Sequence, residues 1–591
     1  MIFPKDFPAR IGFARVAKAV EEMATTPTGR ELIRHARFST DRGYIQTNLN
    51  RLDELKGILM LHGGIPDSGY SDLEEIVAVL GTEDLAASEA QLAELRRALQ
   101  TVRALIRAFR DIAPGGHLLR LCAGYEWPEG VLPILKRVLG DDGLIRDEAS
   151  EELYRIRREL RKRDGKVSSL MNSILAEGQR EGYLPADARV AVRDGQALIP
   201  IPAGAKGKIA AVVQGHSRGG QTLFVAPYAV LELQAEIRGL REEESAEVAR
   251  ILLEVTNALR EEREPIRGCG ELLVEMDVLR AKAKYAVRVG GGKPILVEGQ
   301  RLYLRGAKHP RLLEKMKAEG LEPVPLDIRL DKAQRILVIS GPNAGGKSVC
   351  LKTVGTAVYM LQCGFLPLVK ENSEMGVFDS LLLDIGDAQS MEDELSTYSS
   401  HLMAMREILR HASPKSLVLI DELGSGTEPV AGGAIAESVL TELGDKGPLG
   451  VVTTHYGNLK QLATRTEGLH NGSMAYDVEG MRPLYRLEMG VPGSSFAFEI
   501  AERMGLPEGV IARAAEIAGT EYISLEEQLR AASADKLAWE QKRREIEEAS
   551  RSVEHLRTQL MEATGDLSAQ RRAIMSEARS EAKRIIKEAN R

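Results

Sequence analysis

The chain has 591 residues, 43% of them hydrophobic and 28% charged, which is ordinary for a globular protein of about four domains and excludes a disordered, collagenous or disulfide-framed chain. Lys and Arg number 79 and Asp and Glu 86, so the formal net charge is −7 and no overall cationic field attracts the chain to a polyanion. A contact with nucleic acid must therefore come from a local basic patch.

The sequence shows no signal for a structural metal, a disulfide or a membrane span. Its four cysteines, Cys122, Cys269, Cys350 and Cys363, are widely separated and form no CxxC pair. The longest mostly apolar run, near residues 356–369, falls short of the roughly twenty residues that cross a bilayer. The first residues do not resemble a signal peptide. We therefore expect a cytoplasmic protein with no membrane partner.

The first part of the chain has helical periodicity. Apolar residues recur at spacings of three and four, as in Leu92, Leu95 and Leu99, so residues 1–145 are predicted to form a helical core. Two long helices rich in Glu and Arg, near 147–181 and 230–264, are predicted to form a pair of lever arms within residues 146–265. Residues 266–322 are expected to return to the core and to link it to the next domain.

Between the two arm helices, at about residues 186–228, the apolar period changes to two. Strands are predicted on both sides of Asp194-Gly195, a dipeptide favoured in tight hairpin turns, so a small β-containing clamp is expected at the tip of the arms. This segment contains several basic residues, which could form a solvated surface or could contact a phosphate backbone. No aromatic residues alternate with them, so the sequence gives no sign of base stacking. The basic residues are Arg189, Arg193, Lys206, Lys208, His216 and Arg218.

After Pro323, at residues 323–524, short apolar strands alternate with helices. The runs RILVISG, SLLLDIG, SLVLIDE and LGVVTTH each end at or near a polar or charged residue. This order predicts a mainly parallel, doubly wound sheet whose ligand lies at the carboxyl ends of the strands. The predicted fold class is therefore multidomain, α plus α/β.

Residues 525–591 read as a long charged helix with heptad-compatible apolar positions, which predicts a C-terminal coiled coil. The helical pattern continues to Arg591 without a glycine or proline stop, so we expect that a longer protein continued beyond it. The heptads could add dimer contacts, tether a following domain, or form a solvated single helix.

The strongest motif is GPNAGGKS, which fits G-x-x-x-x-G-K-[ST] between a predicted strand and a predicted helix. Backbone N–H groups of such a loop converge on phosphate oxygens, while Lys347 supplies a positive charge and Ser348 can bind Mg²⁺. The flanking elements favour this interpretation over an ordinary glycine-rich turn. The other residues of the motif are Gly341, Pro342, Asn343, Ala344, Gly345 and Gly346.

Acidic and imidazole groups follow the next strands. Asp421 and Glu422 end SLVLIDE, where Asp421 can hold Mg²⁺ and Glu422 can orient or deprotonate the attacking water, although the pair could instead cap a turn. His455 ends LGVVTTH, from which an imidazole can reach a γ-phosphate. A histidine at a strand end is by itself more often structural.

Together with LSTYSSH at 395–401, LVLIDELGSGTEP and TTHYGNL, the phosphate loop resembles the ATPase of the MutS family, an ABC-type branch. DVLRAKAKYA from Asp277 and KHPRLLE from Lys308 also match. The mismatch-reading domain with its Phe-x-Glu wedge and the connector domain of mismatch-repair proteins are missing. The chain is thus similar to the second bacterial subfamily, MutS-two, which argues against mismatch recognition.

The resemblance implies an ABC-type P-loop ATPase that uses ATP and Mg²⁺. It assigns Asn343, Gly345, Gly346, Lys347 and Ser348 to the phosphates and metal, Asp421 to the metal, Glu422 to the attacking water and His455 to the γ-phosphate. Ser396 stands where the family's signature loop reaches the nucleotide of the other subunit, which implies a homodimer, although the glycines of the LSGGQ form are replaced. No aromatic residue before Arg335 can be assigned to the adenine.

The resemblance also implies two targets. A MutS-two clamp could hold collided ribosomes through rRNA and split their subunits, or it could bind branched DNA and suppress recombination. The net charge of the chain favours neither target over the other. The subfamily's Smr nuclease is not carried over to these 591 residues, and a transporter or chromosome-organising ABC protein is disfavoured because LSGGQ and a membrane segment are missing.

Overall fold

A computed structural model describes residues 1–518 except 63, 194–195, 342–344, 387–396, 478–479, 481, 494–500 and 503, and after 518 it describes 542, 545–546, 549–550, 553, 575 and 578–585. The chain divides into two compact units, one of residues 1–13, 293–362 and 367–591, the other of 14–292 and 363–366. Most of the predicted C-terminal coiled coil lies outside the described residues. In the described part, no helix is long and apolar enough to cross a membrane.

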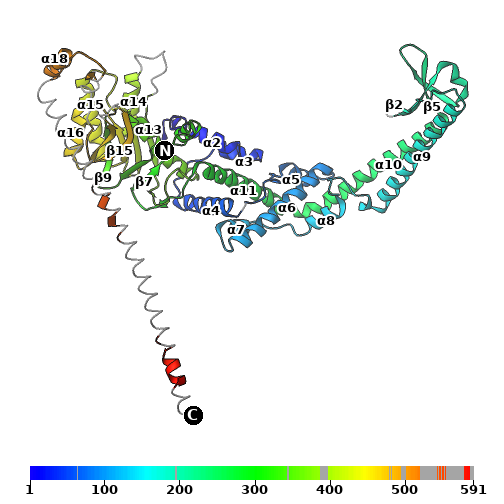
Figure 1. Ribbon diagram of the computed structural model, residues 1–591, viewed down its shortest axis with the longest axis horizontal. Helices are drawn as coiled ribbons and strands as arrows, with labels where there is room; N and C mark the ends of the chain where they lie inside the picture. Colours follow the sequence, from blue (N-terminus) through cyan, green and yellow to red (C-terminus); the bar gives the residue numbers. More distant parts are fainter. Residues whose placement is uncertain are drawn as a thin grey trace. The chain divides into compact units, whose positions relative to one another are not determined.

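The first unit is built on a seven-stranded sheet (Figure 1). Every neighbouring pair of strands is parallel except β14 and β15, which are antiparallel. In spatial order the strands are β1 (Ile2–Phe3), β11 (Ser380–Asp384), β12 (Ser416–Ile420), β13 (Leu449–Thr453), β9 (Gln334–Ser340), β14 (Gly468–Asp477) and β15 (Arg482–Met489). The predicted mainly parallel sheet is thereby confirmed.

Helices cover both faces of this sheet. Val338 and Val418 share one core with α14 (Thr397–His411), α15 (Pro429–Lys446) and α16 (Gly457–Arg465). On the other face, Leu419 lies against Gly355 of α13 (Lys347–Gln362), because a Cβ built on that glycine would be 3.0 Å from the leucine side chain. Neighbouring residues of a strand point to opposite faces, so this sheet is wound on both sides.

A smaller four-stranded sheet accompanies it, in the order β6 (Ile295–Leu296), β10 (Glu374–Met375), β7 (Leu302–Ala307) and β8 (Leu326–Leu330). The unit also contains α1 (Phe7–Arg10), α12 (Pro310–Ala318) and α18 (Glu508–Ala518).

The N-terminal segment differs from its prediction as helical core. Ile2 and Phe3 form β1, which extends the large sheet by pairing with Leu381 and Leu382 of β11. A two-residue strand carries no periodic signal, so only tertiary pairing reveals it. Nearby, His309 of the KHPRLLE segment is buried, and its Nε2 lies 3.0 Å from the Ile11 carbonyl oxygen. That segment therefore fixes the first residues to the sheet domain.

The second unit begins as a bundle of helices. Their bounds are α2 (Phe13–Glu21), α3 (Pro27–Arg34), α4 (Arg42–Leu61), α5 (Glu74–Leu80), α6 (Glu89–Ile112), α7 (His117–Cys122), α8 (Val131–Val138) and α11 (Arg263–Val289). Helix α11 contributes the largest number of buried residues to this bundle, among them Leu272, Leu273 and Met276. The predicted helical periodicity is confirmed in this part of the chain.

The DVLRAKAKYA segment lies on α11 and carries a buried ion pair. Asp277 is fully buried and accepts hydrogen bonds from the backbone N–H groups of Thr25 and Thr26 at 2.8 and 2.7 Å. Its other carboxylate oxygen accepts from Arg280 at 2.9 Å. The Arg280 guanidinium also covers the ring of Tyr70, at 4.4 Å from the centroid. This motif therefore fixes the start of α3 to α11.

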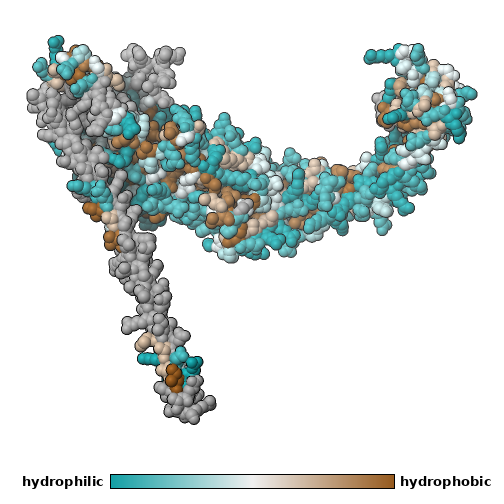
Figure 2. Space-filling view, viewed as in Figure 1, coloured by the Kyte–Doolittle hydropathy of each residue, from teal (hydrophilic) through white to brown (hydrophobic). Residues whose placement is uncertain are grey.

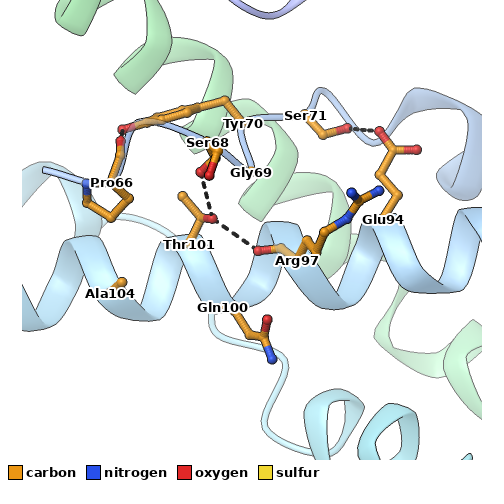
Figure 3. A pocket seen from close by; sticks show the side chains of 10 residues that line it. All are labelled: Pro66, Ser68, Gly69, Tyr70, Ser71, Glu94, Arg97, Gln100, Thr101 and Ala104. Atoms are coloured by element: carbon orange, nitrogen blue, oxygen red, sulfur yellow. Dashed lines mark hydrogen bonds between the residues drawn. The ribbon is translucent and has the colours of Figure 1, made fainter. Parts of the chain in front are cut away.

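Tyr70 belongs to a loop that packs on α6 beside a pocket of about 460 Å³ (Figure 3). In this loop Ser71 donates a hydrogen bond to Glu94 of α6 at 2.7 Å, and Thr101 of α6 donates to the Ser68 carbonyl at 3.2 Å. Several polar groups around the pocket are thus used to hold the loop.

Two long helices form the predicted arms, α9 (Glu151–Arg180) and α10 (Tyr228–Leu259), which run side by side (Figure 1). Short 3₁₀ helices, η1 (Asp147–Ala149) and η3 (Arg260–Glu262), flank them. Their visible surface is mostly hydrophilic (Figure 2). Ion pairs join the helices, with Arg157 2.7 Å from Glu244 and Arg163 2.5 Å from Glu236. These contacts and a small apolar cluster of Ile156, Leu160 and Ile237 stiffen the arm.

The clamp at the tip is a four-stranded sheet in the order β2 (Ala191–Arg193), β3 (Gln196–Pro202), β5 (Thr222–Pro227) and β4 (Ala211–His216). All pairs are antiparallel, and the predicted hairpin joins β2 to β3. Its core is shared with the arm, since Met171 and Leu175 of α9 pack with Ile199 and Val225.

Candidate nucleotide site

The phosphate loop lies where its motif predicts, between β9 and α13. Gly341 and Gly346 have φ angles of +123° and +91°, a region that L side chains rarely adopt, so glycine is required at both positions. Pro342, Asn343 and Ala344 lie outside the described residues, so their predicted roles stay predictions. Ser348 follows in the first turn of α13.

Lys347 is buried at the start of α13. Its ammonium donates a hydrogen bond to the Gly341 carbonyl at 2.6 Å and lies 3.0 Å from His455 Nε2. Burial lowers the pKa of Lys347 to about 8, against the opposing effect of the Glu422 and Asp421 carboxylates. The lysine is therefore held inside the loop, close to both acidic residues.

Asp421 and Glu422 directly follow β12, and Thr453 at the end of β13 holds both. The Thr453 hydroxyl donates to Asp421 Oδ1 at 2.6 Å and accepts the Glu422 backbone N–H at 2.8 Å. Glu422 has a φ of +52°, a conformation that is unfavourable for a residue with a side chain and recurs at functional sites. The neighbouring strand thus positions the pair through Thr453, and the Glu422 carbonyl begins the turn that follows by accepting the Ser425 N–H at 3.0 Å.

His455 joins this group from the chain after β13. Its Nε2 lies 4.0 Å from Glu422 Oε1, and 43% of its side chain is exposed. Burial and the neighbouring Lys347 ammonium lower the pKa of His455. A neutral imidazole whose Nε2 accepts from Lys347 fits these surroundings.

Sequence reasoning missed a second carboxylate–imidazole pair beside the first. Asp384 ends β11, and its Oδ2 lies 2.8 Å from Nδ1 of His401 on α14. This hydrogen bond raises the pKa of His401. The Asp384 carbonyl also accepts the Asp421 backbone N–H at 2.8 Å. The sequence signal for this pair is the aspartate after SLLL, because it ends its strand in the same way as Asp421 follows the neighbouring strand.

Tyr485 was also missed. It lies on β15 with a φ of +55°, is 53% exposed, and a Cβ built on Gly346 would be 3.4 Å from its ring. An exposed aromatic ring therefore lies beside the phosphate loop. Tyr485 follows the loop in sequence and reaches it through the antiparallel edge of the sheet, so the segment before Arg335 gives no sign of it.

The donor set fits Mg²⁺ and triphosphate. Hard cations such as Mg²⁺ prefer oxygen ligands, which Asp421 and the Ser348 hydroxyl can supply. Only Oδ1 of Asp421 accepts from Thr453 in the described residues, and Oδ2 has no such donor there. Ser396, predicted to complete the site in a partner subunit, lies outside the described residues.

The clamp presents the other predicted site residues. Arg189, Arg193 and Arg218 are exposed, as are Lys206 and Lys208 of the 3₁₀ helix η2 (Ala203–Lys208) and His216 of β4. Within the described part of the chain, none of the five Arg and Lys side chains has an acidic partner. Arg193 covers the ring of Phe224 at 3.6 Å from its centroid. The sequence thus missed one aromatic contact on this surface.

Comparison with known proteins agrees with this geometry. Residues 337–520 match the family described as MutS domain V. The chain is 32% identical to Endonuclease MutS2 of Halothermothrix orenii over 96% of its own length and 72% of the relative's. It is 34% identical to the proteins of the same name from Pelotomaculum thermopropionicum and Geobacillus thermodenitrificans, over 98% of its length and 73% of theirs in both cases.

The domain V match extends from within β9 to the end of α18, so the elements that carry Lys347, Asp421 and His455 are those of a MutS-family ATPase. The similarity to the relatives continues through the helical unit and the arms. The chain belongs to the MutS2 family.

Proposed function

We propose that the chain is an ATP-hydrolysing homodimeric clamp that couples closure of its ATPase domains to movement of its arms. The observation that carries this proposal is the convergence of Lys347, Glu422 and His455 at the carboxyl ends of β9, β12 and β13. A buried lysine in a phosphate loop and a carboxylate that can orient water are groups that catalyse phosphoryl transfer to water, and the imidazole lies within reach of both.

In this proposal each side chain has a separate task. The loop N–H groups and Lys347 bind the phosphates, and Ser348 and Asp421 hold Mg²⁺, which neutralises charge developing on the transferred phosphoryl group. Glu422 orients the attacking water and accepts its proton. Once Lys347 has turned to the phosphates, Nε2 of His455 is released, and the imidazole donates to the γ-phosphate from Nε2 after its proton shifts from Nδ1 to Nε2. Tyr485 offers its ring as a stacking surface for the adenine.

We propose a dimer because each nucleotide site would be completed by a residue of the other subunit. If Ser396 of each subunit completes the site of the other, ATP binds two closed ATPase domains better than two open ones and shifts the equilibrium toward closure. The output is then mechanical. We propose dimer formation on this basis and, from family membership, a cytoplasmic location.

The target is proposed to be a polyanion gripped by the clamps. The clamp segment 186–228 carries five Arg and Lys side chains against Asp187 and Asp194, a formal charge of +3 on a chain of −7. Such a patch suits phosphate contacts. We favour ribosomes, through rRNA, with rescue of collided ribosomes and subunit splitting; the alternative is branched DNA, with suppression of recombination.

The relatives' name includes endonuclease activity. For the residues of this chain we propose ATP binding and hydrolysis.

One experiment tests the target. The Glu422→Gln variant is incubated with ATP and Mg²⁺, offered collided ribosomes and a four-way DNA junction together, and sedimented. Retention on ribosomes supports the rescue function, and retention on the junction supports the recombination alternative. A variant with Arg193, Lys206 and Lys208 changed to Gln is the control and should retain neither. If the target were retained equally without ATP, the proposal that ATP closes the clamp on its target would be wrong.

A further inference from the structure

The segment that directly follows the phosphate-loop helix belongs to the other unit. Helix α13 ends at Gln362 in the sheet unit, whereas the next residues, 363–366, pack within the helical unit. The helix that begins with Lys347 therefore ends in one unit, and after the Gln362 peptide bond the chain continues in the other.

On the sheet side, Gln362 is fully buried and fixed. Its Nε2 donates to the Phe378 carbonyl at 2.8 Å, and its Oε1 accepts the Phe378 N–H at 3.1 Å. These two bonds hold the last residue of α13 to the chain just before β11. A displacement of α13 therefore carries this residue and its peptide bond along.

On the helical side, Lys282 of α11 holds the segment. Its ammonium donates to the Cys363 carbonyl at 3.2 Å and to the Gly364 carbonyl at 3.1 Å, and lies 4.2 Å from the centroid of the Phe365 ring. Carbonyls that follow a helix end carry partial negative charge, so a cation is favoured there. Burial of the ammonium lowers the pKa of Lys282 to about 8.

The turn itself is tightly constrained. Gly364 has a φ of +69°, and a Cβ added there would lie 3.7 Å from Asn48 of α4. Helix α11 continues from Lys282 back toward η3 and the end of arm helix α10, within one unit. A path of covalent bonds and hydrogen bonds thus runs from the phosphate loop to the arm.

We propose that Lys282 is a positioning residue that links the nucleotide-dependent position of α13 to α11 and hence to the arms. This inference rests on the proposed function, because it requires ATP to bind at Lys347. Lys282 touches neither the nucleotide site nor the clamp, so removing its ammonium should break the linkage and leave ATP binding in place. The conservative Lys282→Arg change keeps a donor that can reach both carbonyls.

The test uses hydrogen exchange on the full chain, with and without a slowly hydrolysed ATP analogue and Mg²⁺. In the wild type we expect the analogue to change amide exchange in the arms and clamp, residues 150–259, by about fivefold or more, the lower range of allosteric coupling. Lys282→Met should bind the analogue with unchanged affinity, but the exchange rates in residues 150–259 should then be nearly the same with and without it. Lys282→Arg should restore it.

Lys284→Met is the matched control. Lys284 lies two residues along the same helix and is 2.7 Å from the exposed Asp67 carboxylate, away from the turn at 363–366. This variant should respond to the analogue as the wild type does. If Lys282→Met fails to fold by circular dichroism, Gln362→Met, which breaks the other anchor of the same junction, should give the uncoupled result.

The outcomes separate this inference from the proposed function. A Lys282→Met protein that still transmits the full change to the arms would overturn the inference, as would a wild type that binds the analogue without any change in residues 150–259. A wild type that does not bind the analogue would overturn the proposed function, and this inference with it.

Discussion

Lys347 Nζ lies 3.0 Å from His455 Nε2, so the two residues expected to contact the phosphates of ATP contact each other. The ammonium donates to the imidazole and to the Gly341 carbonyl, and these hydrogen bonds compensate for its burial. We expect ATP to replace both partners of the lysine and thereby release His455 to the γ-phosphate. Binding at the loop and arrival of the histidine would then be one coupled event.

Lys347→Ala should weaken ATP binding by about 100-fold or more, as expected for the loss of two charge-assisted hydrogen bonds of about 1.5–3 kcal/mol each. Titration with a fluorescent ATP analogue measures the affinity. Lys352→Ala, five residues further along α13, is the control and should bind as the wild type does. An unchanged affinity in Lys347→Ala would disprove the phosphate assignment.

Glu422→Gln should keep ATP affinity and lower turnover by about 10²–10⁴-fold, because the amide preserves the shape of the side chain but cannot accept the proton. Phosphate release measures turnover, and sedimentation velocity should show a dimer that ATP keeps closed. Glu428→Gln, at the N-cap of α15, is the control and should hydrolyse ATP normally. Wild-type turnover in Glu422→Gln would place the base elsewhere.

Tyr485→Ala should weaken ATP binding by about 5- to 100-fold, as expected for a lost base–aromatic stack of about 1–3 kcal/mol. Binding of inorganic tripolyphosphate should not change, because it has no base. Tyr485→Phe keeps the ring and should bind both ligands normally. Equal losses for ATP and tripolyphosphate would show that the ring supports the loop and does not contact the adenine.

Asp277→Ala should destabilise the helical unit by about 3–5 kcal/mol, because it leaves Arg280 buried without its carboxylate partner. Asp67, which also contacts Arg280 but is 78% exposed on its side chain, provides the control, and Asp67→Asn should cost less than about 1 kcal/mol. Amide exchange of α11 is the measurement. A stable Asp277→Ala protein would mean that the pair adds no stability.

The arms should lose stability at acid pH. Hydrogen bonds from Arg250 and then Ser150 lower the pKa of Glu247 to about 2 from its ordinary value of 4.5. A lowered pKa in the folded state gives stability that is complete above pH 4.5 and is lost as the pH falls toward 2. Glu247→Gln should therefore speed amide exchange of α10 at pH 7 and make it less sensitive to acid. Equal pH profiles for both proteins would contradict this.

Much of the architecture could be read from local patterns. Strand ends with Asp421 and His455, the phosphate loop and the Asp194-Gly195 hairpin each carry a signal within a few residues. Features that depend on distant pairing could not be read in this way. Ile2 and Phe3 form a strand because they pair with β11, which lies far away in the sequence. Tyr485 lies near Gly346 because β15 is the edge strand of the sheet on that side.

The sequence therefore predicts candidate residues where one residue type at one spacing defines the chemistry, and it does not predict contacts that depend on tertiary packing. Lys282 is an example, since nothing in DVLRAKAKYA distinguishes a lysine that binds the turn at Cys363–Gly364 from Lys284, which binds a surface carboxylate. Both follow the same helical pattern. Only the packing of a segment some eighty residues later separates them.

The clamp and the arm share one hydrophobic core, in which Met171 and Leu175 of α9 pack with Ile199 and Val225 of the strands. This limits how the tip can be exchanged among relatives. A chimaera that transfers only residues 186–228 would place foreign strands on helix side chains that had been selected for others, and would open cavities there. A transplant of the clamp must therefore also take the part of α9 that packs against its strands.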